Sequence, residues 1–166
     1  AAYAARKELL EDVGGYTTAG LPGPVYCTNE EAFPLLAARN WDGSAAACAG
    51  AAFYGQGRVL VLADDAIATD GDNTVLVQNA EKWLSQGGTA EIKKVDLATL
   101  EPGAIPELEA FVKAGGGLLT WGRAWPWRQV VAATTGNACV ATWPGNQLLY
   151  KFGLLVGDFC VSQTAD

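Results

Sequence analysis

Histidine is absent from all 166 residues of the chain. Histidine is the side chain that most often changes charge near neutral pH, and it is the commonest protein ligand of transition metals. Its absence excludes the Ser–His and Cys–His pairs that activate the nucleophile in many hydrolases. Any catalysis by this chain would therefore have to rest on other groups, of which the carboxylates are the first candidates.

Charge is also scarce. Charged residues make up only 17% of the chain, its formal net charge is −7, and Lys and Arg never form a run longer than two. These features argue against nucleic acid or an anionic membrane surface as a partner. No apolar run approaches the roughly 18 residues that a membrane span needs, so we expect no direct membrane insertion.

Methionine is absent as well, and the first residues, AAYAARKELL, lack the apolar core of a signal peptide. We therefore expect a processed or internal piece of a longer polypeptide. Its 166 residues fit a single domain, residues 1–166. Two compartments stay open, an extracellular or secreted one, which we prefer, and the cytoplasm.

Four cysteines are spread along the chain without any C-x-x-C pair, which disfavours zinc and thioredoxin-type sites. They are Cys27, Cys48, Cys139 and Cys160. Three pairings are possible, and we prefer Cys139–Cys160 because both residues lie in the C-terminal region. The alternative is four buried free thiols in a reducing compartment.

The segment from Ala45 to Asp65 organises the chain, because two apolar runs flank the turn Tyr54-Gly55-Gln56-Gly57. This pattern predicts a β-hairpin near residues 45–63. Its second run, Val59 to Leu62, is typical of a strand buried on both faces. The run leads into Asp64-Asp65, where α/β proteins often place a ligand contact.

Helical and extended patterns alternate after the hairpin, with short glycine links between them. Before it, Thr28 and Glu31 form a capping box that predicts a helix carrying Phe33 and Leu36, which Pro34 should kink or shorten. The order β-α-β-α-β predicts a mostly parallel sheet with helices on its faces. The expected helices lie near 4–12, 74–85, 106–114, 128–133 and 147–151, and the expected strands near 25–27, 91–97, 118–121, 154–156 and 159–161.

Two groups of acidic residues are candidates for a site. Asp64 and Asp65 could serve as general acid and base or bind a hard cation, but adjacent residues at a strand end point in opposite directions. The alternative is that one caps the next loop and the other is solvated. Asp70 and Asp72 resemble part of a calcium loop without its glutamate, and a helix N-cap is the simpler interpretation.

A cluster of tryptophans follows the strand near 118–121. Trp125 and Trp127, if exposed, could stack on a sugar or anchor a protein partner, and Arg123 beside them could pair with a carboxylate. The alternative is that the tryptophans fill the core of the C-terminal region.

Three motifs in order resemble the glutamine-amidotransferase-like domain of the TRP-channel-associated-factor family. The first is AAFYGQGRVLV at 51–61, the second GGGLL at 115–119 followed by Gly122, Ala124, Trp125 and Trp127, and the third Pro144-Gly145-Asn146 followed by Leu148-Leu149 and Phe152-Gly153. Related domains accompany enhancin-like, mucin-directed zinc metallopeptidases. The resemblance covers residues 25–157.

The resemblance implies a flavodoxin-like three-layer α/β sandwich of the class I amidotransferase superfamily, embedded in a longer protein. It does not imply amidotransferase or peptidase activity, because the chain has no G-x-C-x-G elbow and no H-E-x-x-H helix. Where the family often has histidine and an acidic residue after the central strand, this chain has Asp64 and Asp65. Asn146 in the third motif joins the candidate binding residues.

These observations favour a non-catalytic binding module without a cofactor. Its expected partners are a protein or a glycan, together with other domains of the same polypeptide. One alternative is a carboxylate- or metal-dependent hydrolase that uses the Asp64–Asp65 strand end. The other is a purely structural subunit of a polymer or complex.

Overall fold

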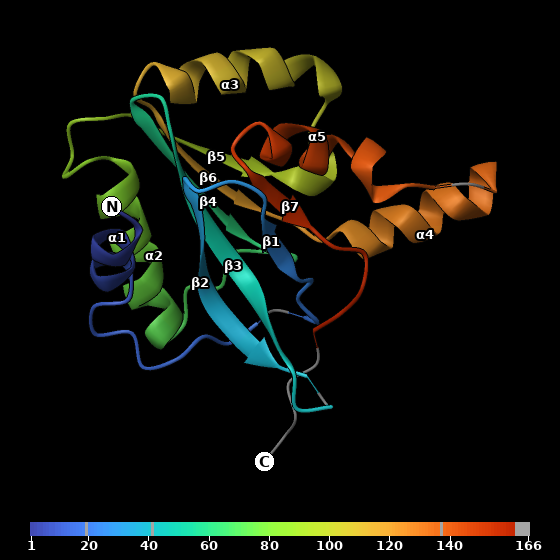
Figure 1. The fold of residues 1–166 in the computed structure, drawn as a ribbon, viewed down its shortest axis with the longest axis horizontal. Helices are drawn as coiled ribbons and strands as arrows, with labels where there is room; N and C mark the ends of the chain where they lie inside the picture. Colours follow the sequence, from blue (N-terminus) through green and yellow to red (C-terminus); the bar gives the residue numbers. More distant parts are fainter. Residues whose placement is uncertain (19, 41, 137, 162–166) are drawn as a thin grey trace.

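A five-stranded sheet forms the centre of the computed structural model, which describes residues 1–18, 20–40, 42–136 and 138–161 (Figure 1). The strand order across this sheet is β2-β3-β4-β6-β5. Its strands are β2 (Ala32–Arg39), β3 (Ala45–Tyr54), β4 (Gly57–Leu62), β5 (Ile92–Asp96) and β6 (Gly117–Trp121). A second, two-stranded sheet pairs β1 (Val25–Cys27) with β7 (Leu154–Val156).

The central sheet is mixed. β2, β3 and β4 pair antiparallel, whereas β6 pairs parallel with β4 on one side and with β5 on the other. The prediction of a mostly parallel sheet is therefore wrong, and with it the prediction of a flavodoxin-like sandwich. Only β4, β6 and β5 follow the β-α-β pattern that the sequence indicates.

The capping box at Thr28 does not begin a helix, because residues 32–39 form the edge strand β2. The side-chain oxygen of Asn29 accepts hydrogen bonds from the backbone N–H groups of Glu31 and Ala32, both 3.0 Å, which closes a turn instead. Pro34 fits this edge strand, because the register between β2 and β3 shifts just after it and an edge position needs fewer donors.

The hairpin predicted near residues 45–63 is present, as β3 and β4. Its turn closes over Gly55, which has a φ of +58°, and Tyr54 pairs with Gly57. A Cβ atom added at Gly57 would lie 2.1 Å from the carbonyl oxygen of Val112 and 2.4 Å from that of Gly116. Glycine at this position therefore lets the hairpin lie directly against the end of the neighbouring helix.

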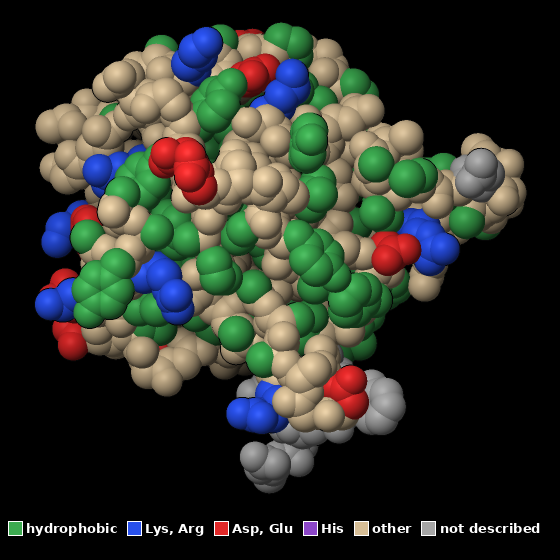
Figure 2. Space-filling model, viewed as in Figure 1, with side chains coloured by type: hydrophobic (Ala, Val, Ile, Leu, Met, Phe, Trp, Pro, Cys, Tyr) green, Lys and Arg blue, Asp and Glu red, His purple; other side chains and the backbone are tan. Residues whose placement is uncertain are grey.

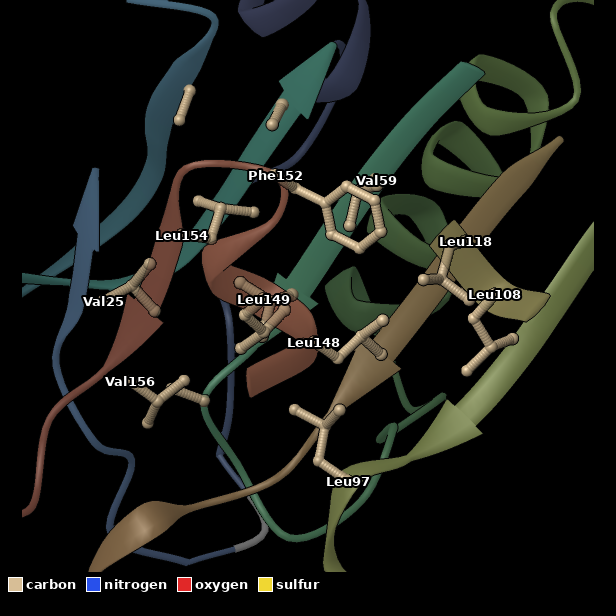
Figure 3. Packing of buried hydrophobic residues seen from close by; sticks show 14 of the residues in the cluster. Val25, Val59, Leu97, Leu108, Leu118, Leu148, Leu149, Phe152, Leu154 and Val156 are labelled. Atoms are coloured by element: carbon tan, nitrogen blue, oxygen red, sulfur yellow. The ribbon is translucent and has the colours of Figure 1, made fainter. Parts of the chain in front are cut away.

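Helices cover both faces of the sheet (Figure 1). One face carries α1 (Ala2–Leu9) and α2 (Asp72–Leu84); the other carries α3 (Ile105–Lys113), α5 (Pro144–Tyr150) and the β1–β7 ribbon. Alternate residues of β4 supply the two cores, with Val59 and Val61 on the α5 side and Leu60 and Leu62 on the α2 side. Figure 3 shows Phe152, Leu154 and Leu149 of the first core packed over Val59.

Helix α4 (Ala124–Thr135) extends away from this body, as the orange helix on the right of Figure 1 shows. It is longer than the predicted helix at 128–133, and only Ala124 of its residues is buried. Three short 3-10 helices complete the described chain: η1 (Leu97–Thr99), η2 (Pro102–Ala104) and η3 (Val140–Thr142). The strand predicted at 159–161 does not form.

No helix in the described ranges has both the length and the apolar character needed to cross a membrane.

Candidate functional site

The carboxyl ends of three parallel strands bring the candidate residues to one edge of the sheet. Leu62 of β4 and Asp96 of β5 both align with Trp121 of β6. The residues that follow these strands must therefore lie side by side, and in α/β sheets this edge is the usual place for a ligand. Asp65, Asp96 and Arg123 all lie there.

Asp64 and Asp65 belong to different surroundings, because the chain bends just beyond the end of β4 at Leu62. Asp64 is 1% exposed and lies on the α2 side of the sheet. Its carboxylate accepts a hydrogen bond from the Tyr16 hydroxyl at 3.5 Å and another from the backbone N–H of Asp65 at 2.8 Å. Asp64 is thus enclosed by the loop that carries Tyr16.

The groups around Asp64 are held in their neutral forms. Burial, together with the nearby Asp64 carboxylate, raises the pKa of the Tyr16 hydroxyl above its usual value. Burial is also the main cause that raises the pKa of the Cys48 thiol to about 11, and Asp64 adds to it. A neutral thiol is a weak nucleophile, so Cys48 is not activated by these surroundings.

Asp65 forms an ion pair with Arg123 across the edge of the sheet. Both carboxylate oxygens accept hydrogen bonds, one from Nε and one from Nη2 of the guanidinium. The remaining nitrogen, Nη1, donates to the carbonyl oxygen of Leu21 at 3.1 Å, and the guanidinium lies 4.7 Å from the centre of the Trp125 ring. This pair therefore joins the loop before β1 to the ends of β4 and β6.

A hollow of about 320 Å³ opens beside this ion pair, and we call it the carboxyl-edge pocket. Its lining comprises Asp65, Asp96, Ala98, Gly122, Arg123, Pro126, Trp127, Val130 and Trp143. Trp143 is fully buried, whereas Trp127 is half-buried. The pocket thus combines indole and aliphatic walls with two carboxylates and one paired guanidinium.

The structure brings Asp65, Arg123 and Trp127 of the predicted site residues together in this pocket. Trp125 lies under Arg123 instead, and its Nε1 is buried without a hydrogen-bond partner among the described residues. The tryptophans are thus divided, because Trp83 and Trp143 fill the core while Trp127 faces the pocket.

The side chain of Asn146 forms hydrogen bonds with backbone groups of two neighbouring segments. Its side-chain amide donates to the carbonyl oxygens of Val140 (3.0 Å) and Val156 (2.9 Å) and accepts from the N–H of Val156 (2.8 Å). The buried amide therefore ties α5 to β7 and η3, and none of its contacts faces the pocket.

Asp70 and Asp72 do not assemble a metal site. Within the described ranges, no group of three or more His, Cys, Asp or Glu side chains is placed to hold an ion. Both residues are exposed at the start of α2, and Asp72 lies in its first turn, where a carboxylate favours the helix dipole. The buried polar residue of this segment is Asn73, which exchanges hydrogen bonds with the backbone of Thr17 at 2.9 and 2.7 Å.

The predicted Cys139–Cys160 disulfide is not formed, because all four cysteines are free in the structure. Cys48 is buried, Cys160 is partly buried, and Cys27 and Cys139 are exposed. The alternative prediction of four buried free thiols is also wrong, because Cys27 and Cys139 are exposed.

Asp96 is the pocket residue that sequence reasoning missed. Asp96 is the last residue of β5, and Asp64-Asp65 follow shortly after the end of β4. In a parallel arrangement the carboxyl ends of these two strands lie at the same edge of the sheet, and this could have indicated Asp96. The segment EIKKVDL is polar throughout, as is typical of an edge strand, so a further carboxylate in it does not indicate a site.

Comparison with known families identifies the domain. The family model described as "TRPM8, N-terminal domain" (TCAF_N) matches residues 3–100 and 97–165. The chain belongs to this family. The TRPM8 channel-associated factor 2 of Bos taurus is 29% identical over 91% of the chain, and a TRPM8 channel-associated factor homolog of Danio rerio is 30% identical over 90%. The chain spans only 19% of the length of each of these relatives.

Solved structures show the same fold at low identity. IMPa from Pseudomonas aeruginosa, in complex with an O-glycopeptide, superposes with a TM-score of 0.61 at 14% identity, covering 93% of this chain and 22% of that one. IMPa metallopeptidase in complex with T-antigen gives a TM-score of 0.55 at 16% identity. The TCAF_N domain thus shares its architecture with part of a metallopeptidase, and at these identities the likeness concerns the fold alone.

Proposed function

We propose that this TCAF_N domain is a non-enzymatic protein-interaction module that binds its partner through the projecting arm. The projecting arm consists of α4 (Ala124–Thr135) and η3 (Val140–Thr142). The observation that carries the proposal is the arm's exposed surface, which is uncharged beyond Arg128. No Asp, Glu, Lys or Arg occurs between Arg128 and Lys151, and Val130 is 65% exposed.

The threonine hydroxyls of α4 form hydrogen bonds with backbone carbonyl groups of the same helix. The Thr134 hydroxyl donates to the carbonyl oxygen of Val131 at 3.0 Å, and the Thr135 hydroxyl donates to the same oxygen at 2.8 Å. In Figure 2 the projection on the right bears hydrophobic side chains and uncharged atoms, with Lys or Arg and Asp or Glu side chains together at its lower side. Depletion of charged residues is typical of the core of a protein interface.

The base of the arm is held in place by two ion pairs. Arg123 pairs with Asp65, and Arg128 pairs with Asp158 at 3.2 Å. Such pairs add little stability, but they fix the direction in which a helix leaves the body. A preorganised arm lowers the entropy that a partner must overcome on binding.

The names of the relatives indicate the class of partner. Those proteins are TRPM8 channel-associated factors. We propose that the partner of this domain is likewise a membrane channel of the TRPM8 kind. The other domains of the parent polypeptide would then position the arm against the channel.

The enzymatic alternative has less support. Asp64 faces Tyr16 rather than Asp65, so the two carboxylates do not act as a pair, and the raised pKa of the Cys48 thiol disfavours nucleophilic attack. A glycan partner would have to use Trp127, which is the predicted aromatic residue that faces the carboxyl-edge pocket.

Binding of the purified domain to detergent-solubilised TRPM8, measured by biolayer interferometry, tests the proposal. Val130→Glu places a charge on the arm, and we expect it to weaken binding at least tenfold because the carboxylate must be desolvated. The control is Tyr3→Glu, which charges an exposed hydrophobic residue of α1 on the opposite side of the sheet and should leave binding unchanged. Equal binding by Val130→Glu and the wild type, or no binding by the wild type, would contradict the proposal. Light scattering on the same samples would detect self-association, the mark of a structural subunit.

A further inference from the structure

The carboxyl-edge pocket carries an excess of negative charge. Its lining includes the carboxylates of Asp65 and Asp96 and the guanidinium of Arg123. Asp65 and Arg123 neutralise each other, which leaves the charge of Asp96. One oxygen of Asp96 accepts the backbone N–H of Ala98 at 2.9 Å, and the carboxylate makes no ion pair within the part of the chain that the structure describes.

Arg123 is not available to an anionic ligand. Its Nε and Nη2 donate to Asp65, its Nη1 donates to Leu21, and one face of the guanidinium lies on Trp125. A carboxylate or phosphate would have to displace Asp65 and then lie near Asp96. The pocket therefore selects against anions.

The walls of the pocket suit the aliphatic stem and the charged head of a basic side chain. Trp127 provides indole surface, and Pro126, Ala98 and Val130 provide aliphatic surface. A cation over the face of an indole ring is attracted by the ring's electrons, and the attraction is stronger when the cation is desolvated. The chain makes this contact elsewhere, since the Arg58 guanidinium lies 5.1 Å from the centre of the Trp83 ring.

The size and position of the pocket indicate where such a side chain would come from. A volume of about 320 Å³ is at the low end of ligand sites and suits one side chain better than a larger molecule. Val130 lines the pocket and is also the most exposed large hydrophobic residue of the projecting arm, so a protein docked on the arm would pass directly beside the opening.

We propose that the carboxyl-edge pocket receives a lysine or arginine side chain of the protein that docks on the projecting arm, with Asp96 as its counter-ion and Trp127 as its aromatic wall. This inference rests on the proposed function, because it assumes a protein partner on the arm. The formal net charge of −7 favours a basic partner in the same way.

Small cations test the pocket without the partner. We would titrate the ¹⁵N-labelled domain with n-propylguanidinium and n-butylammonium and follow the indole N–H signals, with that of Trp127 assigned by its loss in Trp127→Phe. We expect the Trp127 signal to shift for both cations and not for the neutral n-pentanol. Raising the salt from 20 to 200 mM should weaken the response.

Asp96→Asn is the decisive variant. Asparagine keeps the oxygen that accepts the Ala98 N–H, so the strand end is preserved while the charge is removed. We expect at least threefold weaker cation binding, whereas the control Glu101→Gln, an exposed acid outside the pocket, should bind as the wild type does. Equal binding by Asp96→Asn, or equal shifts with n-pentanol, would overturn the inference.

The outcomes distinguish the two proposals. If Val130→Glu abolishes channel binding but no cation binds the pocket, the interaction module stands and the basic anchor is wrong. If cations bind through Asp96 but the domain does not bind the channel, the pocket's preference stands, whereas the docking of that channel on the arm is wrong.

Discussion

Asp64 and Asp65 are adjacent in the sequence but have unrelated roles at the level of the single residue. In the bend that follows β4, the side chain of Asp64 contacts Tyr16 and that of Asp65 pairs with Arg123. The sequence predicts their separation on the assumption of a strand end, where neighbouring residues point in opposite directions. Their partners could not be predicted, since Tyr16 and Arg123 are 48 and 58 residues away along the chain.

Asn146 has a structural role that its motif, Pro144-Gly145-Asn146, does not indicate. Its side chain makes three hydrogen bonds to backbone groups, two of them buried, and they join segments whose proximity no local pattern indicates. Its part in binding stays a prediction.

Cys48 allows a prediction about pH. Its thiol has a pKa of about 11 in the folded protein, compared with 9.0 without the effects of the fold. Between these values the unfolded chain loses the proton and the folded chain keeps it, so the free energy of unfolding should fall as the pH rises from 9 to 11. A shift of this size corresponds to roughly 2–3 kcal/mol.

Urea unfolding at pH 8, 9, 10 and 11 measures this effect in the wild type and in Cys48→Ala. The variant removes the group, so its free energy of unfolding should fall less between pH 9 and 11, whatever its stability at pH 8. Parallel pH profiles for the two proteins would contradict the assignment. Tyr16, whose pKa is also raised, should contribute a further loss above pH 10 in both proteins.

At the level of the element, the sequence was informative wherever periodicity was undisturbed. The hairpin, α2, α3, β5 and β6 lie within a few residues of their predicted positions. β2 was missed because a capping box at Thr28 imitates a helix start, and because Pro34 weakens the evidence for a strand unless the strand is known to lie at an edge.

Helix α4 was predicted too short for a related reason. Trp125, Pro126 and Trp127 look like an aromatic loop, yet proline is well accepted in the first turn of a helix, where these residues lie. The helix ends at Gly136, whose φ of +70° is the left-handed conformation that glycine commonly adopts at a helix C-terminus.

The contact between the hairpin and α3 gives a prediction at this level. Gly57→Ala places a methyl group 2.1 Å from the carbonyl oxygen of Val112, which is backbone and cannot turn aside. We expect a loss of about 3 kcal/mol in the free energy of unfolding, measured with urea. Gly103→Ala is the control, because its Cβ would meet no atom within 4 Å, and it should change stability by less than about 0.5 kcal/mol. Equal stability of the two variants would show that the close approach is not present in solution.

For the whole molecule, the sequence predicted an α/β domain but not its mixed sheet. The order of elements indicates that β4, β6 and β5 run parallel, and the hairpin turn indicates that β3 and β4 run antiparallel. The pairing of β2 with β3 is not indicated, because the capping box at Thr28 predicts a helix where β2 lies. The carboxyl-edge pocket could be foreseen only in part, because Asp65 and Arg123 follow recognisable strands but the place of Asp96 depends on the strand order.

The arrangement of the molecule separates a rigid body from a projecting surface. Two cores, one on each face of the sheet, stabilise the body, and α4 leaves it beside the pocket at the carboxyl edge (Figure 1). This arrangement places the uncharged surface and the acidic pocket next to each other, which is the geometry that a single partner could use.

Hydrogen–deuterium exchange of the domain, alone and bound to TRPM8, tests this account most directly. We predict that peptides from 124–142 exchange more slowly in the complex, while peptides from α1 and α2 on the opposite face are unchanged, because the partner covers the arm and leaves the far side of the sheet exposed. Protection confined to α1 and α2, with none on the arm, would contradict the account.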